Sequence, residues 1–121
     1  MEIKSEIKGN AYGIKISAYE DGEEAGWVYF YIISNDLHKE PVGIIENLFV
    51  HEKFRRLGIG SALIKNLINK AKEIGCYKIV CTSRHENIKV HEFYKKLGFQ
   101  DRGLEFRMDL SGNFFHDTCS I

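Results

Sequence analysis

The 121-residue sequence lacks the features of several common classes of protein. It has no formal net charge, because 17 acidic residues balance 17 basic ones. A protein that binds nucleic acid usually carries clustered Lys and Arg, so the balance and the absence of basic runs predict no nucleic-acid partner. No apolar run is long enough to cross a bilayer, and the first six residues, MEIKSE, do not resemble a signal peptide. We therefore expect a cytoplasmic protein with no membrane contact.

Cysteine is scarce. The three cysteines, Cys76, Cys81 and Cys119, match neither a CxxC pair nor the spacing of a zinc finger. We expect reduced thiols and no bound metal. Because Cys81 stands in an apolar, strand-like run, we interpret it as a small buried residue in preference to a nucleophile. At this length the chain is predicted to form one domain, 1–121, around a single core.

Apolar patterning predicts strands in the first half of the chain. Residues 3–7 hint at a short strand. Period-two alternation over 14–18 and an aromatic-rich run over 27–33 predict two strands, and the Asp-Gly pair at 21–22 predicts a turn that makes them a hairpin. A further strand is predicted over 43–50, where alternation fails near the end, which indicates either complete burial or a bulge.

The second half alternates helices and strands. A 3.6-residue apolar period predicts a helix that follows a glycine pair and ends at Gly75, and 78–83 reads as a buried strand. Strand, helix and strand in this order predict a right-handed parallel crossover. A second helix is predicted over 87–98, and alternation predicts a last strand over 104–110.

The glycine pair before the first helix predicts a binding site for an anion. Gly58 and Gly60 let the backbone approach a ligand, and the first amides of a helix have no partner within it. Such amides bind phosphate oxygens, and Arg55 and Arg56 add positive charge. The dinucleotide fingerprint fails because Leu63 stands where it requires glycine, and the chain has no Gly-Lys pair followed by Ser or Thr. We expect a phosphorylated ligand of another kind.

Two segments resemble the signatures of the GNAT family of N-acetyltransferases. Residues 55–60, RRLGIG, are similar to its pyrophosphate loop, Arg/Gln-x-x-Gly-x-Gly/Ala. Residues 87–99, NIKVHEFYKKLGF, resemble its second signature, Asn-x-x-Ala-x-x-Phe-Tyr-x-x-x-Gly-Phe, with Val90 in place of alanine. The resemblance covers 43–110. It implies the mixed α/β fold of acyl-CoA N-acyltransferases, with a mostly antiparallel mixed sheet, a splayed parallel pair, flanking helices and a shortened N-terminal region.

The resemblance implies acetyl-CoA as cosubstrate. The strand before the loop would pair with the pantetheine arm, the Leu48 amide would polarise the thioester carbonyl, and the loop amides would hold the pyrophosphate. Asn87 would hydrogen-bond the pantetheine, cap its helix, or do both. The implied cofactor-binding residues are Leu48, Phe49, Val50, Arg55, Arg56, Leu57, Gly58, Ile59, Gly60, Ser61 and Asn87.

The reaction implied is direct transfer of acetyl to a primary amine in a ternary complex. Tyr94 would protonate the departing thiolate, and its alternative role is that of a core aromatic. Glu46 is the candidate base, through water, because it is the only carboxylate in the 43–50 strand; the alternative is a solvent-facing strand residue. The acceptor is a small-molecule, protein or peptide amine, and its side of the site is either open or completed by a second subunit in a homodimer.

Two other functions remain open at this point. A non-catalytic acyl-CoA-binding or sensing domain would keep the phosphate loop without a base. A nucleotide-binding regulatory module would bind ATP or NAD at the same loop.

Overall fold

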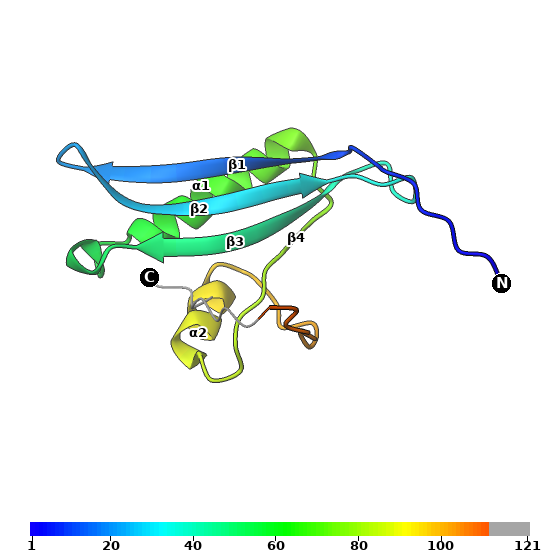
Figure 1. The fold of residues 1–121 in the computed structure, drawn as a ribbon. Helices are drawn as coiled ribbons and strands as arrows, with labels where there is room; N and C mark the ends of the chain where they lie inside the picture. Colours follow the sequence, from blue (N-terminus) through cyan, green and yellow to red (C-terminus); the bar gives the residue numbers. More distant parts are fainter. Residues whose placement is uncertain (112–121) are drawn as a thin grey trace.

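A four-stranded sheet in the order β1-β2-β3-β4 forms the framework of the protein (Figure 1). The computed structural model describes residues 1–111. Its elements are β1 (Ala11–Glu20), β2 (Glu23–Ile33), β3 (Val42–Val50), the short 3-10 helix η1 (Glu52–Phe54), α1 (Ile59–Ile74), β4 (Lys78–Val80) and α2 (Ile88–Lys96). β1, β2 and β3 pair antiparallel, whereas β3 and β4 pair parallel. The predicted mixed, mostly antiparallel sheet with flanking helices is confirmed.

β1 and β2 form the predicted hairpin. Asp21 and Gly22 make its turn with φ angles of 50° and 78°, the left-handed backbone that Asp-Gly pairs favour. β2 begins four residues earlier than its aromatic run suggests, because Glu23 already pairs with Glu20.

One face of the sheet packs against α1, which lies behind the three antiparallel strands in Figure 1. α1 connects β3 to β4 and ends at Gly75, whose φ of 91° is the predicted left-handed C-cap. The side chains buried between the sheet and α1 include Val28, Phe30, Ile32, Ile45, Val50, Leu63, Ile64 and Leu67. Burying one aliphatic or aromatic side chain completely contributes about 1.5 to 3 kcal/mol to the stability of the fold.

β3 contains the bulge that its broken alternation suggested. Tyr29 pairs with Glu46, whereas Trp27 pairs with Phe49, so β3 has one more residue than β2 over this interval. Asn47, inside the extra stretch, has a φ of 54°. The bulge therefore explains the pattern of this strand, as an inserted residue bends a strand and leaves part of it unpaired.

The parallel pair is short and then separates. β3 and β4 pair only from Val42 and Lys78 to Ile44 and Val80. Beyond this point β3 continues to Val50, while residues 81–84 leave the sheet. The splayed parallel pair expected from the resemblance is present.

Three predicted strands are wrong in whole or in part. Residues 1–10 and 104–110 have no secondary structure and are exposed, and β4 ends at Val80 and not at residue 83. Side-chain alternation does not provide a neighbouring strand with which to exchange backbone hydrogen bonds, and a strand needs one. The suggestion that the tail pairs or frays concerns residues 112–121, which lie outside the described part of the chain.

Two further observations concern the described residues alone. The first element of the described residues is β1, and residues 1–10 contain no helix. None of the helices within 1–111 has the length and apolar character needed to cross a membrane.

Candidate active site

A pocket of about 440 Å³ opens where β3 and β4 separate. One wall is the bulge of β3, residues 45–48, and the opposite wall is 81–84, the continuation of β4. α2 contributes Asn87 at its start and Tyr94 from its second turn, and residues 105–107 complete the lining. The pocket, which we call the splay pocket, thus exists because the two parallel strands diverge.

The splay pocket brings together four residues singled out in the sequence. Glu46, Leu48, Asn87 and Tyr94 all line it, although they are separated by up to half of the described chain. Glu46 is exposed and Leu48 is buried, so the bulge turns neighbouring side chains in different directions.

A second pocket, of about 250 Å³, lies against the glycine pair. We call it the loop pocket. Phe93 of α2 borders it and Tyr94 borders the splay pocket, so the two pockets lie along the same helix. The predicted cofactor residues that line the loop pocket are Val50, Arg55, Arg56, Gly58, Ile59, Gly60 and Ser61.

Two of the predicted cofactor-binding residues, Phe49 and Leu57, line neither pocket. The Phe49 ring stacks on Trp27 with centroids 4.8 Å apart, on the face of the sheet opposite α1. Leu57 is 64% exposed. A role for either in cofactor binding would therefore involve its backbone, which is how the resemblance assigned them.

The start of α1 presents backbone amides to the loop pocket. Gly58 is the N-cap with a φ of 79°, and the first bond within the helix runs from the Ala62 amide to the Gly58 carbonyl, at 3.0 Å. The amides of Ile59, Gly60 and Ser61 therefore have no partner inside the helix. Arg56 is also left-handed, with a φ of 67°. These amides point toward the N-terminal end of the helix, where the dipole favours an anion.

Arg55 fixes the loop to the end of β3. Its Nε donates a hydrogen bond of 2.9 Å to the Val50 carbonyl oxygen, and its guanidinium lies 5.9 Å from the Phe49 ring centroid. The Arg55 side chain, which is expected to bind a phosphate, thus also holds the loop against β3.

Tyr94 combines a core position with a place in the splay pocket. It is only 7% exposed and packs edge-on against Phe93 and Phe99, with centroids 5.1 and 5.3 Å away. It forms a side-chain hydrogen bond with Cys81. The two roles weighed for Tyr94, core aromatic and site residue, are therefore compatible.

Cys81 is a half-buried residue in the wall of the splay pocket. Burial raises the pKa of Cys81 to about 11, the hydrogen bond with Tyr94 opposes this rise, and the nearby charge of Glu46 adds to it. A thiol with so high a pKa stays protonated at neutral pH, and thiols react as thiolates. This agrees with the interpretation of Cys81 as a small residue and not a nucleophile.

Sequence reasoning missed several residues of the splay pocket. Ser83 is the most informative, because its Oγ is buried and has no hydrogen-bond partner among the described residues. A buried polar atom without a partner is costly, so a bound ligand that hydrogen-bonds it would relieve that cost. Glu105 is a second carboxylate in the lining. Only the separation of the strands places them there, and no sequence pattern marked either residue.

Asn87 occupies the N-cap position of α2 without a side-chain capping bond. Its carbonyl accepts the first helical bonds, from Val90 and His91, both at 3.2 Å. The side-chain amide of Asn87 is therefore not used to cap the helix and borders the pocket. No cluster of His, Cys, Asp and Glu within residues 1–111 has the arrangement of a metal site.

Comparison with known proteins agrees with this geometry. Residues 2–99 match the model of the acetyltransferase (GNAT) family. The chain is 38% identical over 69 residues to the glucosamine 6-phosphate N-acetyltransferase of Trypanosoma brucei brucei, which covers 57% of this chain and 45% of that protein. It is 29% identical over 116 residues to an aminoglycoside N(6')-acetyltransferase type 1 of Stenotrophomonas maltophilia, covering 90% of this chain and 74% of that protein.

The fold has close counterparts among solved structures. An aminoglycoside acetyltransferase from an uncultured soil metagenomic sample superposes with a TM-score of 0.74 at 28% identity, covering 83% of this chain and 67% of that one. Because the family model spans most of the sequence, this chain belongs to the GNAT acetyltransferase family. The chain spans less than half the length of the trypanosomal relative.

Proposed function

We propose that this chain is an N-acetyltransferase that transfers acetyl from acetyl-CoA to a primary amine by direct attack in a ternary complex. The observation that carries the proposal is the position of the splay pocket and the loop pocket along α2, one lined by polar groups and the other by unpaired helix amides. Names of relatives, glucosamine 6-phosphate N-acetyltransferase and aminoglycoside N(6')-acetyltransferase, support an amine acceptor.

The residues present fit a CoA thioester. The amides at the start of α1, with Arg55 and Arg56, would hold the pyrophosphate. Ser83 and Asn87 offer side-chain hydrogen bonds in the splay pocket, where Ser83 has no partner among the described residues. Acetyl-CoA supplies an activated acyl group. The protein's task is to position that group and to move protons.

The bulge of β3 supports a role for the Leu48 amide. Asn47 and Leu48 have no cross-strand partner in the register of β2 and β3. A bulge leaves part of its strand unpaired, and in this proposal the Leu48 amide hydrogen-bonds the thioester carbonyl oxygen as negative charge develops there. Removing one such donor has cost roughly 3 kcal/mol in other enzymes.

Two side chains of the splay pocket would handle the protons. The neutral amine nitrogen attacks the carbonyl carbon, a C–N bond forms, and the C–S bond breaks. The departing thiolate takes a proton from the Tyr94 hydroxyl, which lies in the wall beside Cys81. The amine nitrogen, positively charged after the attack, passes one proton through water to Glu46. Return of a proton from Glu46 through solvent to the Tyr94 phenolate restores both groups, so a neutral amine gives the amide and the CoA thiol with no net release of protons.

The acceptor in this proposal is a small-molecule, protein or peptide amine in the cytoplasm. Its side of the site is open to solvent or completed by a second subunit.

The proposal is tested by calorimetric titration of acetyl-CoA into the protein, with CoA and ATP as controls. We expect acetyl-CoA and CoA to bind and ATP to give no response, and acetyl transfer to appear in a panel of amines. Absence of acetyl-CoA binding would overturn the proposal. Binding with no turnover of any amine, in the wild type and in Tyr94→Phe alike, would indicate an acyl-CoA-binding or sensing domain instead.

A further inference from the structure

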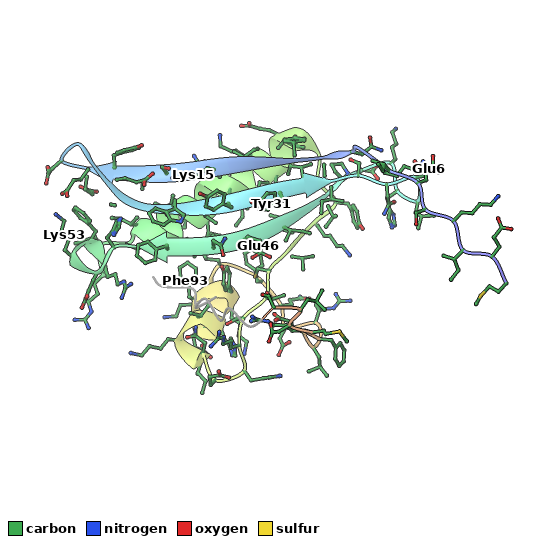
Figure 2. All side chains as sticks on the ribbon, viewed as in Figure 1. Glu6, Lys15, Tyr31, Glu46, Lys53 and Phe93 are labelled. Atoms are coloured by element: carbon green, nitrogen blue, oxygen red, sulfur yellow. The ribbon has the colours of Figure 1, made fainter. Side chains whose placement is uncertain are left out.

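The face of the sheet opposite α1 carries a cluster of aromatic side chains. Trp27, Tyr29 and Tyr31 alternate with buried residues of β2, and Phe49 stands opposite Trp27 on β3. The rings of Trp27 and Phe49 stack with centroids 4.8 Å apart, and those of Tyr29 and Tyr31 lie 6.5 Å apart. We call these four residues the aromatic face. Figure 2 labels Tyr31 there, between Lys15 on β1 and Glu46 on β3.

An ammonium group of the chain already lies over the aromatic face. Lys15 Nζ is 5.1 Å from the Trp27 ring centroid and 6.0 Å from that of Tyr29. These distances are within the range in which a ring attracts a cation. Lys15 also pairs with Glu24 at 3.2 Å, and its side chain is 41% exposed. The two rings and the Glu24 carboxylate thus form a site for a cation, and the partly exposed side chain of Lys15 occupies it.

Glu46 joins the aromatic face to the splay pocket. It lines the pocket and stands directly opposite Tyr29 in the sheet. Directly opposed Cβ atoms in a sheet are about 5 Å apart. Trp27 is two residues farther along β2, or about 7 Å at the rise of a strand. A molecule with one amine beside Glu46 would therefore reach Trp27 with a second cation about 7 Å away.

We propose that the acceptor carries a second ammonium about 7 Å from the nitrogen that is acetylated, and that this ammonium replaces Lys15 Nζ over Trp27 and Tyr29. The inference rests on the proposed acetyltransferase function and names its substrate class. Charge favours it locally, because Glu24 lies 3.2 Å from Lys15 Nζ and so places a carboxylate beside the cation position over Trp27. A linear diamine and an amino sugar with several amines both have this chemistry.

Trp27 provides a direct probe, because it is the only tryptophan in the sequence. Its fluorescence is followed while cadaverine, kanamycin, n-pentylamine or ethylenediamine is added to the full chain with CoA present. We expect saturable changes with cadaverine or kanamycin and none with n-pentylamine, which lacks the second cation, or with ethylenediamine, which is too short. Tighter binding of cadaverine would identify the acceptor as a linear diamine, and tighter binding of kanamycin would identify it as an amino sugar. Equal responses to n-pentylamine, or no response to either polycation, would overturn the inference.

Two variants and a matched control locate the effect. Lys15→Met removes the resident ammonium but keeps an apolar stem, so calorimetry should show cadaverine binding about two- to fivefold tighter. Trp27→Leu should weaken cadaverine binding by about two- to fivefold. Tyr12→Leu removes an exposed aromatic residue that pairs with Ile32 at the other end of β1, and it should change nothing. Equal effects of Trp27→Leu and Tyr12→Leu would overturn the inference.

Failure of this inference is distinguishable from failure of the proposed function. Acetyl-CoA is titrated into each variant, and acetylation of n-pentylamine is measured beside that of cadaverine. Normal acetyl-CoA binding with no preference for the diamine would overturn the substrate class alone. Loss of acetyl-CoA binding in the wild type would overturn the proposed function.

Discussion

Arg55 Nε donates a hydrogen bond of 2.9 Å to the carbonyl oxygen of Val50. This bond joins the end of β3 to the loop that begins α1. It is only partly buried, and it links residues five positions apart. The Arg55 side chain therefore helps to set the position of the loop amides relative to β3.

Replacing Arg55 with Met should loosen the loop. We expect the free energy of unfolding to fall by about 1 kcal/mol, the usual contribution of such a hydrogen bond. Acetyl-CoA affinity should fall more steeply, because both a charge and the position of the amides are lost. Chemical denaturation and calorimetry measure the two effects. An unchanged affinity in a destabilised variant would show that Arg55 has a structural role only.

Gly58→Ala should weaken acetyl-CoA binding, and Gly75→Ala is its matched control. Both glycines are left-handed, with φ angles of 79° and 91°, and an added Cβ would meet nothing within 4 Å at either position. Each variant should lose about 1 kcal/mol of stability through backbone strain. Only Gly58 borders the loop pocket, so only its variant should bind acetyl-CoA less tightly. Equal binding by both variants would remove the loop from the cofactor site.

Tyr94→Phe should reduce kcat about 100-fold or more, while acetyl-CoA affinity stays close to that of the wild type. The phenyl ring keeps the packing against Phe93 and Phe99 and loses only the hydroxyl beside Cys81. Tyr77→Phe, at an exposed position just before β4, serves as the control. Steady-state kinetics with a reactive amine measures both variants. Full activity of Tyr94→Phe would assign the proton transfer to another group.

Cys81 should alkylate slowly in the folded protein. Because its pKa is raised to about 11, about one thiol in a thousand is ionised at pH 8. The rate of Cys81 alkylation by iodoacetamide should rise about tenfold per pH unit toward pH 11. In the unfolded protein, Cys81 should react as fast as an ordinary thiol. Peptide mass spectrometry reports the site. Rapid modification at pH 8 in the native state would contradict the buried, protonated thiol.

The same thiol should make stability depend on alkaline pH. Its pKa is about 11 when folded, against about 8.5 for an ordinary thiol, so its contribution is complete below pH 8.5 and is lost as pH rises toward 11. Burial also raises the pKa of Cys76, which acts in the same direction. Denaturation curves for the wild type and Cys81→Ala between these pH values should therefore converge. Parallel curves would show that Cys81 does not titrate with folding.

Much of the framework was predictable, because local patterns decide it. The Asp-Gly turn, the apolar period of α1 and the glycines at its two ends are all found where the sequence predicted them. The two signatures also lie along the two pockets, although no pattern in the sequence says how far apart those pockets are.

The rest depended on contacts between distant segments. Residues 104–110 alternate like a strand yet join no sheet in the described structure. Cys81 and Ser83 looked like the end of a buried strand, and the divergence of β3 and β4 instead makes them pocket wall. Whether a segment becomes strand or pocket wall depends on which strands separate, and side-chain periodicity carries no information about that separation.

The bulge at Asn47 has a consequence for how this chain tolerates insertions and deletions. Successive side chains of a strand point to opposite faces, so residues three positions apart should lie on different faces. Glu46 and Phe49 are three apart, yet both stand opposite residues of the aromatic face. The extra residue thus changes which side chains face the core, just before Val50. Deleting it would rotate everything downstream by half a turn, burying Phe49, exposing Val50 and presenting the glycine loop to the wrong side of the sheet. The number of residues at this point of β3 is therefore constrained by the register of the sheet.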